Sequence, residues 1–138
     1  EEVTQIKQQM FTVKRKFFFY KETKKCAVFG DYDTAVGMKQ LLEELGLEVN
    51  RAEILYQTEV EEPLVAGGTE FDRMKYLKQE SLLLLLGDGA TIEMDYTAKS
   101  SHQVSNPNLH HIMIYPYTPF IGFRGMLYWI EKILNISL

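Results

Sequence analysis

The chain has little of what disulfide-bonded, metal-thiolate or membrane-spanning proteins need. Its 138 residues contain one cysteine, Cys26, so neither a disulfide nor a cysteine cluster can form within the chain. No apolar run approaches the ~20 residues that cross a bilayer, and no secretory signal peptide is visible. We therefore expect a cytoplasmic protein without a membrane partner, in which Cys26 is a buried, inert thiol.

Neither sign of charge dominates the chain. The formal net charge of −4 gives no general reason to expect nucleic acid as a partner, and the hydrophobic fraction of 46% is ordinary for a globular domain. The charge is uneven, because residues 1–25 carry seven Lys/Arg against three acids. The basic cluster at residues 14–16 precedes four consecutive aromatic residues. This run favours a helix packed on the body over a nucleic-acid arm.

Hydrophobic periodicity predicts alternating strands and helices. Residues 1–20 have a helical apolar spacing, and residues 26–29 form a short apolar run typical of a strand covered on both faces. Gly30 ends this strand, Asp33 or Thr34 caps the helix that follows, and Gly46 ends that helix. Further strands are expected at 47–55, 81–86 and 110–117, further helices at 70–79, 92–98 and 126–135, and loops at 57–69, 99–109 and 118–125.

Several residues have defined places in this scheme. Asn50 and Arg51 indicate a position near the edge of the sheet, and Phe71 belongs to the apolar face of its helix. The whole pattern predicts an α/β fold, a three-layer Rossmann-like domain with a four-stranded parallel sheet. We expect one domain over residues 1–138, with a lead-in helix at 1–20 and an α/β body at 25–138.

Small and polar residues follow three of the predicted strands. Because ligands gather at the carboxyl ends of parallel strands, we expect them to form a ligand-binding rim. The rim residues are Gly30, Asp31, Asp33, Gly87, Asp88, Thr91, Thr118, Gly122 and Arg124. Turn chemistry alone explains most clusters of this kind, so the pattern marks a place and assigns no catalytic residue.

The familiar ligand motifs are incomplete. The dinucleotide fingerprint lacks its later glycines, no phosphate-binding loop occurs, and a cobalamin domain would need a histidine where Asp33 stands. Asp31, Asp33 and Asp88 form a weak candidate for a divalent cation, without the later lysine of a phosphoryl-transfer receiver. Neighbouring His110 and His111 would point to opposite faces of a strand, so no metal ligand is assigned.

Two stretches together resemble the last Rossmann-like domain of the nitrogenase component 1 family. Residues 25–33 leading into 41–49 are similar to the family's strand, Gly-Asp turn and helix, and Gly122-Phe123-Arg124-Gly125 is similar to its Gly-Tyr-x-Gly turn. The family includes nitrogenase iron–molybdenum subunits, their cofactor-assembly scaffold relatives and dark-operative protochlorophyllide reductase subunits.

The resemblance implies part of an oxidoreductase subunit. It implies a C-terminal domain that contributes to a cofactor or substrate pocket and is inactive alone, with no cofactor in this fragment and an iron–sulfur cluster in the full-length protein. The implied partners are a paralogous or identical component 1 subunit and an ATP-dependent iron–sulfur reductase. The family's cofactor histidine has no counterpart at residues 112–121. A stand-alone module that binds a small ligand or metal, and a pure interaction domain, remain the alternatives.

Overall fold

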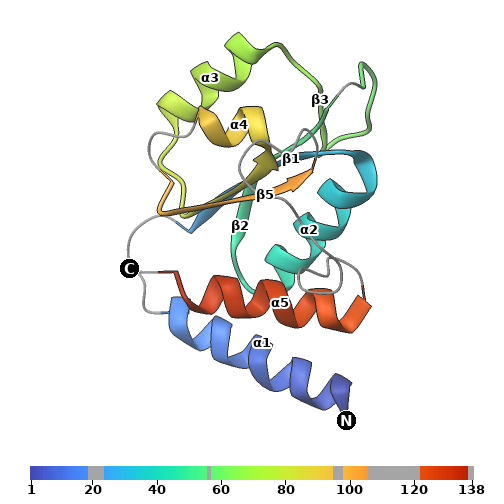
Figure 1. The fold of residues 1–138 in the computed structure, drawn as a ribbon, viewed down its shortest axis with the longest axis vertical. Helices are drawn as coiled ribbons and strands as arrows, with labels where there is room; N and C mark the ends of the chain where they lie inside the picture. Colours follow the sequence, from blue (N-terminus) through green and yellow to red (C-terminus); the bar gives the residue numbers. More distant parts are fainter. Residues whose placement is uncertain (19–23, 56, 95–97, 106–121, 137–138) are drawn as a thin grey trace.

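The computed structural model describes residues 1–18, 24–55, 57–94, 98–105 and 122–136 of the chain. This part of the chain forms ten helices and strands, which alternate except that β3 follows β2 directly (Figure 1). The elements are α1 (Glu2–Phe18), β1 (Lys25–Gly30), α2 (Tyr32–Glu44), β2 (Glu48–Ile54), β3 (Val65–Ala66), α3 (Glu70–Gln79), β4 (Leu84–Asp88), α4 (Gly89–Glu93), β5 (Ser100–Ser105) and α5 (Gly122–Leu134). Within these residues no helix has the length and apolarity of a membrane span.

The five strands of the described residues form one parallel sheet in the order β3-β2-β1-β4-β5. The α/β class and the parallel sheet are confirmed, but the predicted number of four strands is wrong. Both additional strands lie where loops were predicted, β3 within 57–69 and β5 within 99–109. The predicted strand at 110–117 lies outside the described residues.

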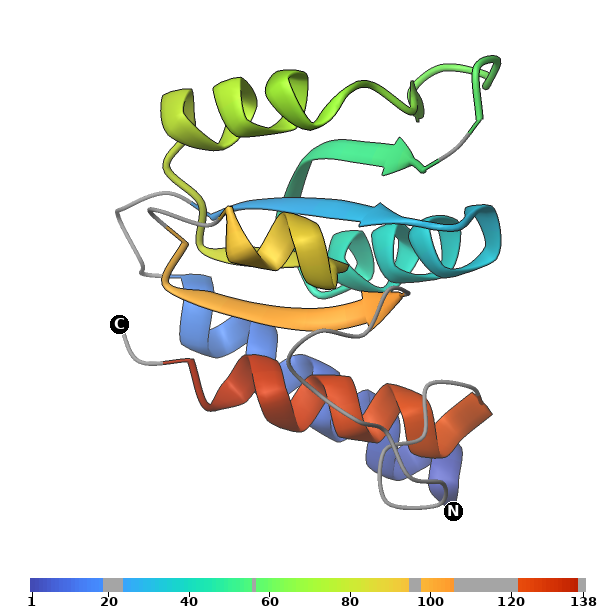
Figure 2. The ribbon, with the colours of Figure 1, turned by 45° about the horizontal axis from the view of Figure 1, so that its top comes forward.

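The two faces of the sheet carry separate cores. Along β1, Cys26 and Val28 join a core with α1, α2 and α5, whereas Ala27 and Phe29 join a second core with α3 and α4. All four of these side chains are fully buried, which confirms a strand covered on both faces. Figure 2 shows the layers, with α3 on one side of the sheet and α1 and α5 on the other.

The lead-in helix packs on the body, as predicted. α1 lies alongside α5 (Figure 1) and buries Ile6, Val13 and Phe17 in the first core. At its last turn, the Lys16 ammonium donates hydrogen bonds to the carbonyl oxygens of Leu134, the last residue of α5, and of Ile136, the latter at 2.7 Å. This lysine satisfies carbonyl groups that a helix end leaves without partners.

Other local predictions are confirmed. α3 has the predicted bounds, five leucines at 82–86 are buried, and Gly46 adopts a left-handed φ of 84° after α2. Asn50 and Arg51 lie in the part of β2 that β3 does not pair with, because β3 pairs only with Glu53 and Ile54. The edge position inferred for them is therefore correct.

Helix starts were predicted less well. α2 has Asp31 rather than Asp33 or Thr34 at its N-cap. α4 starts at Gly89 and ends at Glu93, so Thr91 is its third residue and not its cap. In each case the Gly-Asp sequence ends the strand and starts the helix without an intervening turn.

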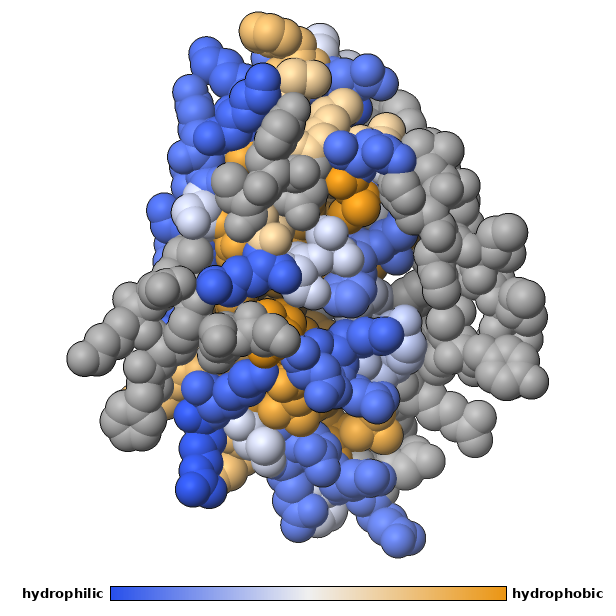
Figure 3. All heavy atoms as spheres, turned by 60° about the vertical axis from the view of Figure 1, so that its left-hand side comes forward, coloured by the Kyte–Doolittle hydropathy of each residue, from blue (hydrophilic) through white to orange (hydrophobic). Residues whose placement is uncertain are grey.

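Two further expectations about helices are wrong. α5 begins at Gly122, so residues 122–125 are its first turn and not a loop before a helix at 126. Phe71 is 72% exposed, because α3 turns Arg73 and Leu77 toward the sheet instead. On the face drawn in Figure 3, hydrophilic side chains lie between the apolar ones.

Candidate functional site

The carboxyl ends of β1 and β4 lie side by side at the middle of the sheet. The strands pair in parallel, with Val28 opposite Leu86. From this pair the chain continues in opposite directions, since α2 leads from β1 to β2 whereas α4 leads from β4 to β5. A reversal of strand order leaves a crevice at the strand ends, which is where open α/β sheets bind ligands.

The turn after β1 presents carboxylates to solvent. Gly30 is buried, and Asp31 follows in an extended conformation (φ −66°, ψ 166°) as the N-cap of α2. The Asp31 carbonyl oxygen accepts the first helical hydrogen bond from the amide of Ala35 at 2.9 Å, while its side chain makes no capping bond. Asp31, Tyr32 and Asp33 are all exposed, so two carboxylates and the first amides of a helix remain available to a ligand.

The polar side chains of the turn after β4 are buried and bond to each other. Asp88 is 2% exposed and Thr91 is fully buried, and the Thr91 hydroxyl donates a hydrogen bond to Oδ1 of Asp88. A methyl group at Gly87 would lie 3.3 Å from Cβ of Thr91 and 3.6 Å from Cβ of Phe29. Gly87 is therefore needed for Thr91 to pack against the strand.

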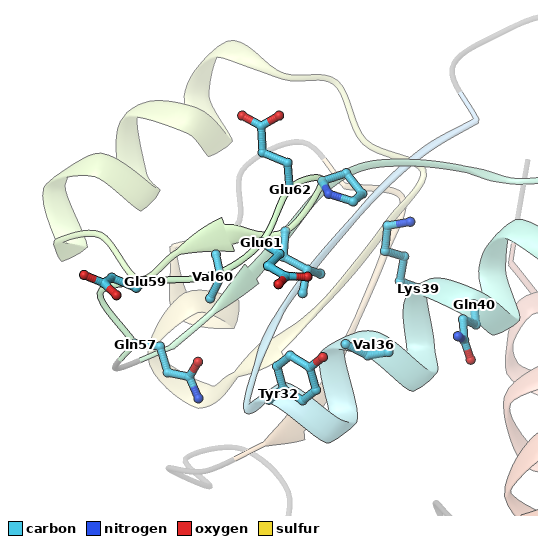
Figure 4. Close-up of a pocket in the computed structure, with 11 residues that line it drawn as sticks. Tyr32, Val36, Lys39, Gln40, Gln57, Glu59, Val60, Glu61 and Glu62 are labelled. Atoms are coloured by element: carbon cyan, nitrogen blue, oxygen red, sulfur yellow. The ribbon is translucent and has the colours of Figure 1, made fainter.

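A cavity of about 500 Å³ opens beside the first of these turns (Figure 4). It lies between the first turns of α2 and residues 57–64, the segment after β2. In Figure 4, Lys39 reaches from α2 toward this segment, whereas Glu59 and Glu62 point away from α2. The lining residues are Tyr32, Val36, Lys39, Gln40, Gln57, Glu59, Val60, Glu61, Glu62, Pro63 and Leu64.

The charged groups of this cavity are unequal in number. Among the described lining residues, Lys39 is the one cation against three glutamates, and its ammonium already lies 2.5 Å from Oε1 of Glu43. The floor is apolar, with Val36 and Leu64 among its residues. The arrangement suits an apolar group with polar or cationic substituents, bound next to the β1 turn.

The structure brings most of the predicted rim together. Gly30, Asp31 and Asp33 after β1 lie beside Gly87, Asp88 and Thr91 after β4. Gly122 and Arg124 belong to the first turn of α5, and Thr118 lies outside the described residues. The rim residues that follow β1 and β4 are therefore neighbours in the structure.

A charged cluster between β2 and α3 was not predicted from the sequence. Glu53 of β2 is fully buried, and its Oε1 accepts hydrogen bonds from Arg51 Nε (3.2 Å) and Nη2 (2.7 Å). Its Oε2 accepts from the amide of Gly68 at 3.5 Å and lies 3.6 Å from Nη1 of Arg73 on α3. The alternation Arg51-x-Glu53 within a strand was the available signal, since it places both charges on one face of the sheet.

The residues of this chain do not fit an iron–sulfur cluster. Cys26 is fully buried, and burial raises the pKa of its thiol to about 12, so no thiolate is available at neutral pH. The described residues contain no group of three or more His, Cys, Asp or Glu that fits a metal ion.

His102 contacts neighbouring side chains. Its ring meets the Trp129 ring edge-on at 5.8 Å, and its Nε2 lies 3.0 Å from the Ser100 hydroxyl. Burial, with a smaller effect of nearby Lys132, lowers the pKa of His102, which favours the neutral imidazole. His110 and His111 lie outside the described residues.

Comparison with known protein families gives a match that covers the whole chain. The family model described as nitrogenase component 1 type oxidoreductase matches residues 1–138, the whole chain. No curated protein matches the chain. Because the family model covers every residue, the chain belongs to the nitrogenase component 1 type oxidoreductase family.

Proposed function

We propose that the chain is the C-terminal domain of a longer nitrogenase-like oxidoreductase subunit, in which it forms one wall of a cofactor or substrate pocket. The observation that carries this proposal is the pair of buried strand ends, β1 and β4, held side by side at the reversal of strand order. Family membership supplies the class of reaction. In this proposal the domain is inactive alone, because the ligands of the iron–sulfur cluster belong to another part of the longer protein.

The two turns have different tasks in this proposal. Asp31 and Asp33 are exposed, so they contact the bound molecule or its waters through carboxylate oxygens. Asp88 and Thr91 satisfy one another and fix the backbone of the neighbouring turn. One turn thus contacts the ligand, and the other keeps the crevice in shape, as preorganised sites require.

The remaining parts of the reaction lie outside this chain. In the proposed protein an iron–sulfur cluster is bound by residues elsewhere, electrons arrive from an ATP-dependent iron–sulfur reductase, and the partner is a paralogous or identical component 1 subunit. The proposal places this protein in the cytoplasm and includes neither nucleic acid nor membrane. Thr118, Gly122 and Arg124 complete the rim.

Iron and acid-labile sulfide in the longer protein, purified without oxygen, test this proposal. The 138-residue chain is the control. We expect iron and sulfide in the longer protein and neither of them in the 138-residue chain. In the loaded protein, Asp31→Asn should slow reduction of substrate while the iron content stays unchanged. Glu44→Gln, an exposed carboxylate at the far end of α2, is the matched control. A longer protein that holds no iron after reconstitution would overturn the proposal.

A further inference from the structure

The buried cluster around Glu53 carries more positive than negative charge. One carboxylate faces two guanidinium groups, and the Arg51 and Arg73 side chains are only 24% and 11% exposed. Charge that is withdrawn from water is costly unless an opposite charge lies near it. The cluster therefore has a surplus cation that Glu53 does not neutralise.

Donor atoms of both arginines remain unused. Arg73 donates from Nη1 to the Gly68 carbonyl oxygen at 3.1 Å, yet its buried Nε has no hydrogen-bond partner in the described part of the chain. Arg51 uses Nε and Nη2 on Glu53, and no hydrogen bond from its Nη1 occurs among the described residues. Of these two side chains, only Arg51 is among the described lining residues of the adjoining cavity, so its Nη1 is the donor that an acceptor from outside the chain can reach.

A cavity of about 410 Å³ adjoins this cluster, and Arg51, Gly68, Asp72, Lys75 and Tyr76 are among its lining residues. Its volume is within the range of small-molecule sites. Lys75 adds a third cation, and Asp72 is the one carboxylate among the lining residues. Hydrogen bonds from Thr69, and then the nearby Arg51 and Lys75, lower the pKa of Asp72. Among the described lining residues, the two cations Arg51 and Lys75 thus face one carboxylate.

Arg51, which forms the cationic wall of this cavity, is held in place before any ligand binds. The Arg51 guanidinium lies over the Tyr76 ring, 5.0 Å from its centroid, and the Tyr76 hydroxyl accepts a hydrogen bond from Asn50 Nδ2 at 2.6 Å. A guanidinium fixed by an ion pair and a ring loses little conformational freedom on binding.

We propose that this cavity, between the edge of β2 and α3, is a binding site for a small oxyanion, a carboxylate or phosphate group held by Arg51 and Lys75. The guanidinium fork matches both kinds of group. The site lies on the α3 face of the sheet, away from the turns after β1 and β4, and it does not depend on the function proposed above. The surplus charge, the unused donors and the preformed wall all favour an anion.

Backbone amide NMR, with inorganic phosphate and succinate titrated at constant ionic strength, tests the site. We expect saturable shifts at Gly68 and Tyr76. Lys75→Gln should raise the Kd for the bound anion about tenfold, which is the loss of affinity expected for one charge-assisted hydrogen bond. Lys75 is exposed, so this variant retains the fold, and Lys7→Gln on α1 is the matched surface control. Saturation by phosphate alone assigns a phosphate ligand, and saturation by succinate alone assigns a carboxylate.

Arg51→Gln provides an independent variant. Arg73 still faces Glu53 in this protein, so the buried carboxylate keeps one counter-charge. We expect a loss of affinity of at least the same size. The absence of saturable shifts with either anion, equal weakening in Lys7→Gln, or shifts confined to Asp31 and Asp88 would each overturn the proposal.

Discussion

The contact between Gly87 and Thr91 leads to a sharp prediction. Gly87→Ala places a methyl group 3.3 Å from Thr91 Cβ, 3.4 Å from Thr91 Cγ2 and 3.6 Å from Phe29 Cβ. Thr91 is fully buried and bonded to Asp88, so it cannot move away without weakening that hydrogen bond. Overpacking of this kind lowers the free energy of unfolding by about 1–3 kcal/mol.

Gly37 is the matched control for this substitution. It lies inside α2, exposed, and a methyl group there would meet nothing within 4 Å. Because alanine favours the helix, Gly37→Ala should raise the free energy of unfolding by about 0.5–1 kcal/mol. The same chemical change should therefore shift stability in opposite directions at the two glycines.

Urea unfolding measures both effects, with an unchanged slope against denaturant showing that only stability has altered. Thr91→Ser removes the methyl group at 3.4 Å and keeps the hydroxyl, so it should recover part of the loss when combined with Gly87→Ala. An unfolding midpoint for Gly87→Ala equal to that of the wild type would refute the reasoning. It would mean that Thr91 is not fixed against the strand.

Three further predictions concern single side chains. Burial raises the pKa of the Cys26 thiol to about 12, so Cys26 should resist alkylation at neutral pH in the folded protein and react on unfolding. Alkylation of the native protein would contradict this prediction. The lowered pKa of His102 means that the unfolded chain binds its proton more readily, so the free energy of unfolding should fall as the pH drops below about 6.5. His102→Gln should remove part of that fall, and an identical pH profile would exclude a contribution from this imidazole. Lys16→Gln should lower the free energy of unfolding by about 1.5–3 kcal/mol in thermal or urea unfolding, because two carbonyl groups lose a charged donor. Exposed Lys14→Gln is its control, and equal stability of the two variants would argue against the interaction.

The parts of the fold that the sequence predicted are those in which burial follows a regular period. β1 and the leucines of β4 are apolar throughout because helices cover both faces, and α1 buries apolar residues at helical spacing. β5 was missed because it is a polar edge strand, Ser-Ser-His-Gln-Val-Ser, held by pairing with β4. β3 has two residues, too few for any period to be visible.

The parts of the site also differ in how well the sequence predicts them. The turns after β1 and β4 were predictable, because glycine and aspartate are needed where a buried strand meets a helix. The Glu53 cluster was predictable only in part, because the alternation Arg51-x-Glu53 lies within β2, whereas Arg73 comes from α3 and the Gly68 amide from the segment after β3. Only the folded chain brings these groups together.

The contact between α1 and α5 has a consequence for how the domain is made. The hydrogen bonds of Lys16 join residues 118 and 120 positions apart, so α1 leaves the ribosome long before its docking partner is synthesised. Until α5 emerges, the apolar stripe of Ile6, Val13 and Phe17 has no surface to cover it. The nascent chain thus exposes an apolar helix face for most of its synthesis. Such a helix is a substrate for the chaperones that bind exposed apolar segments.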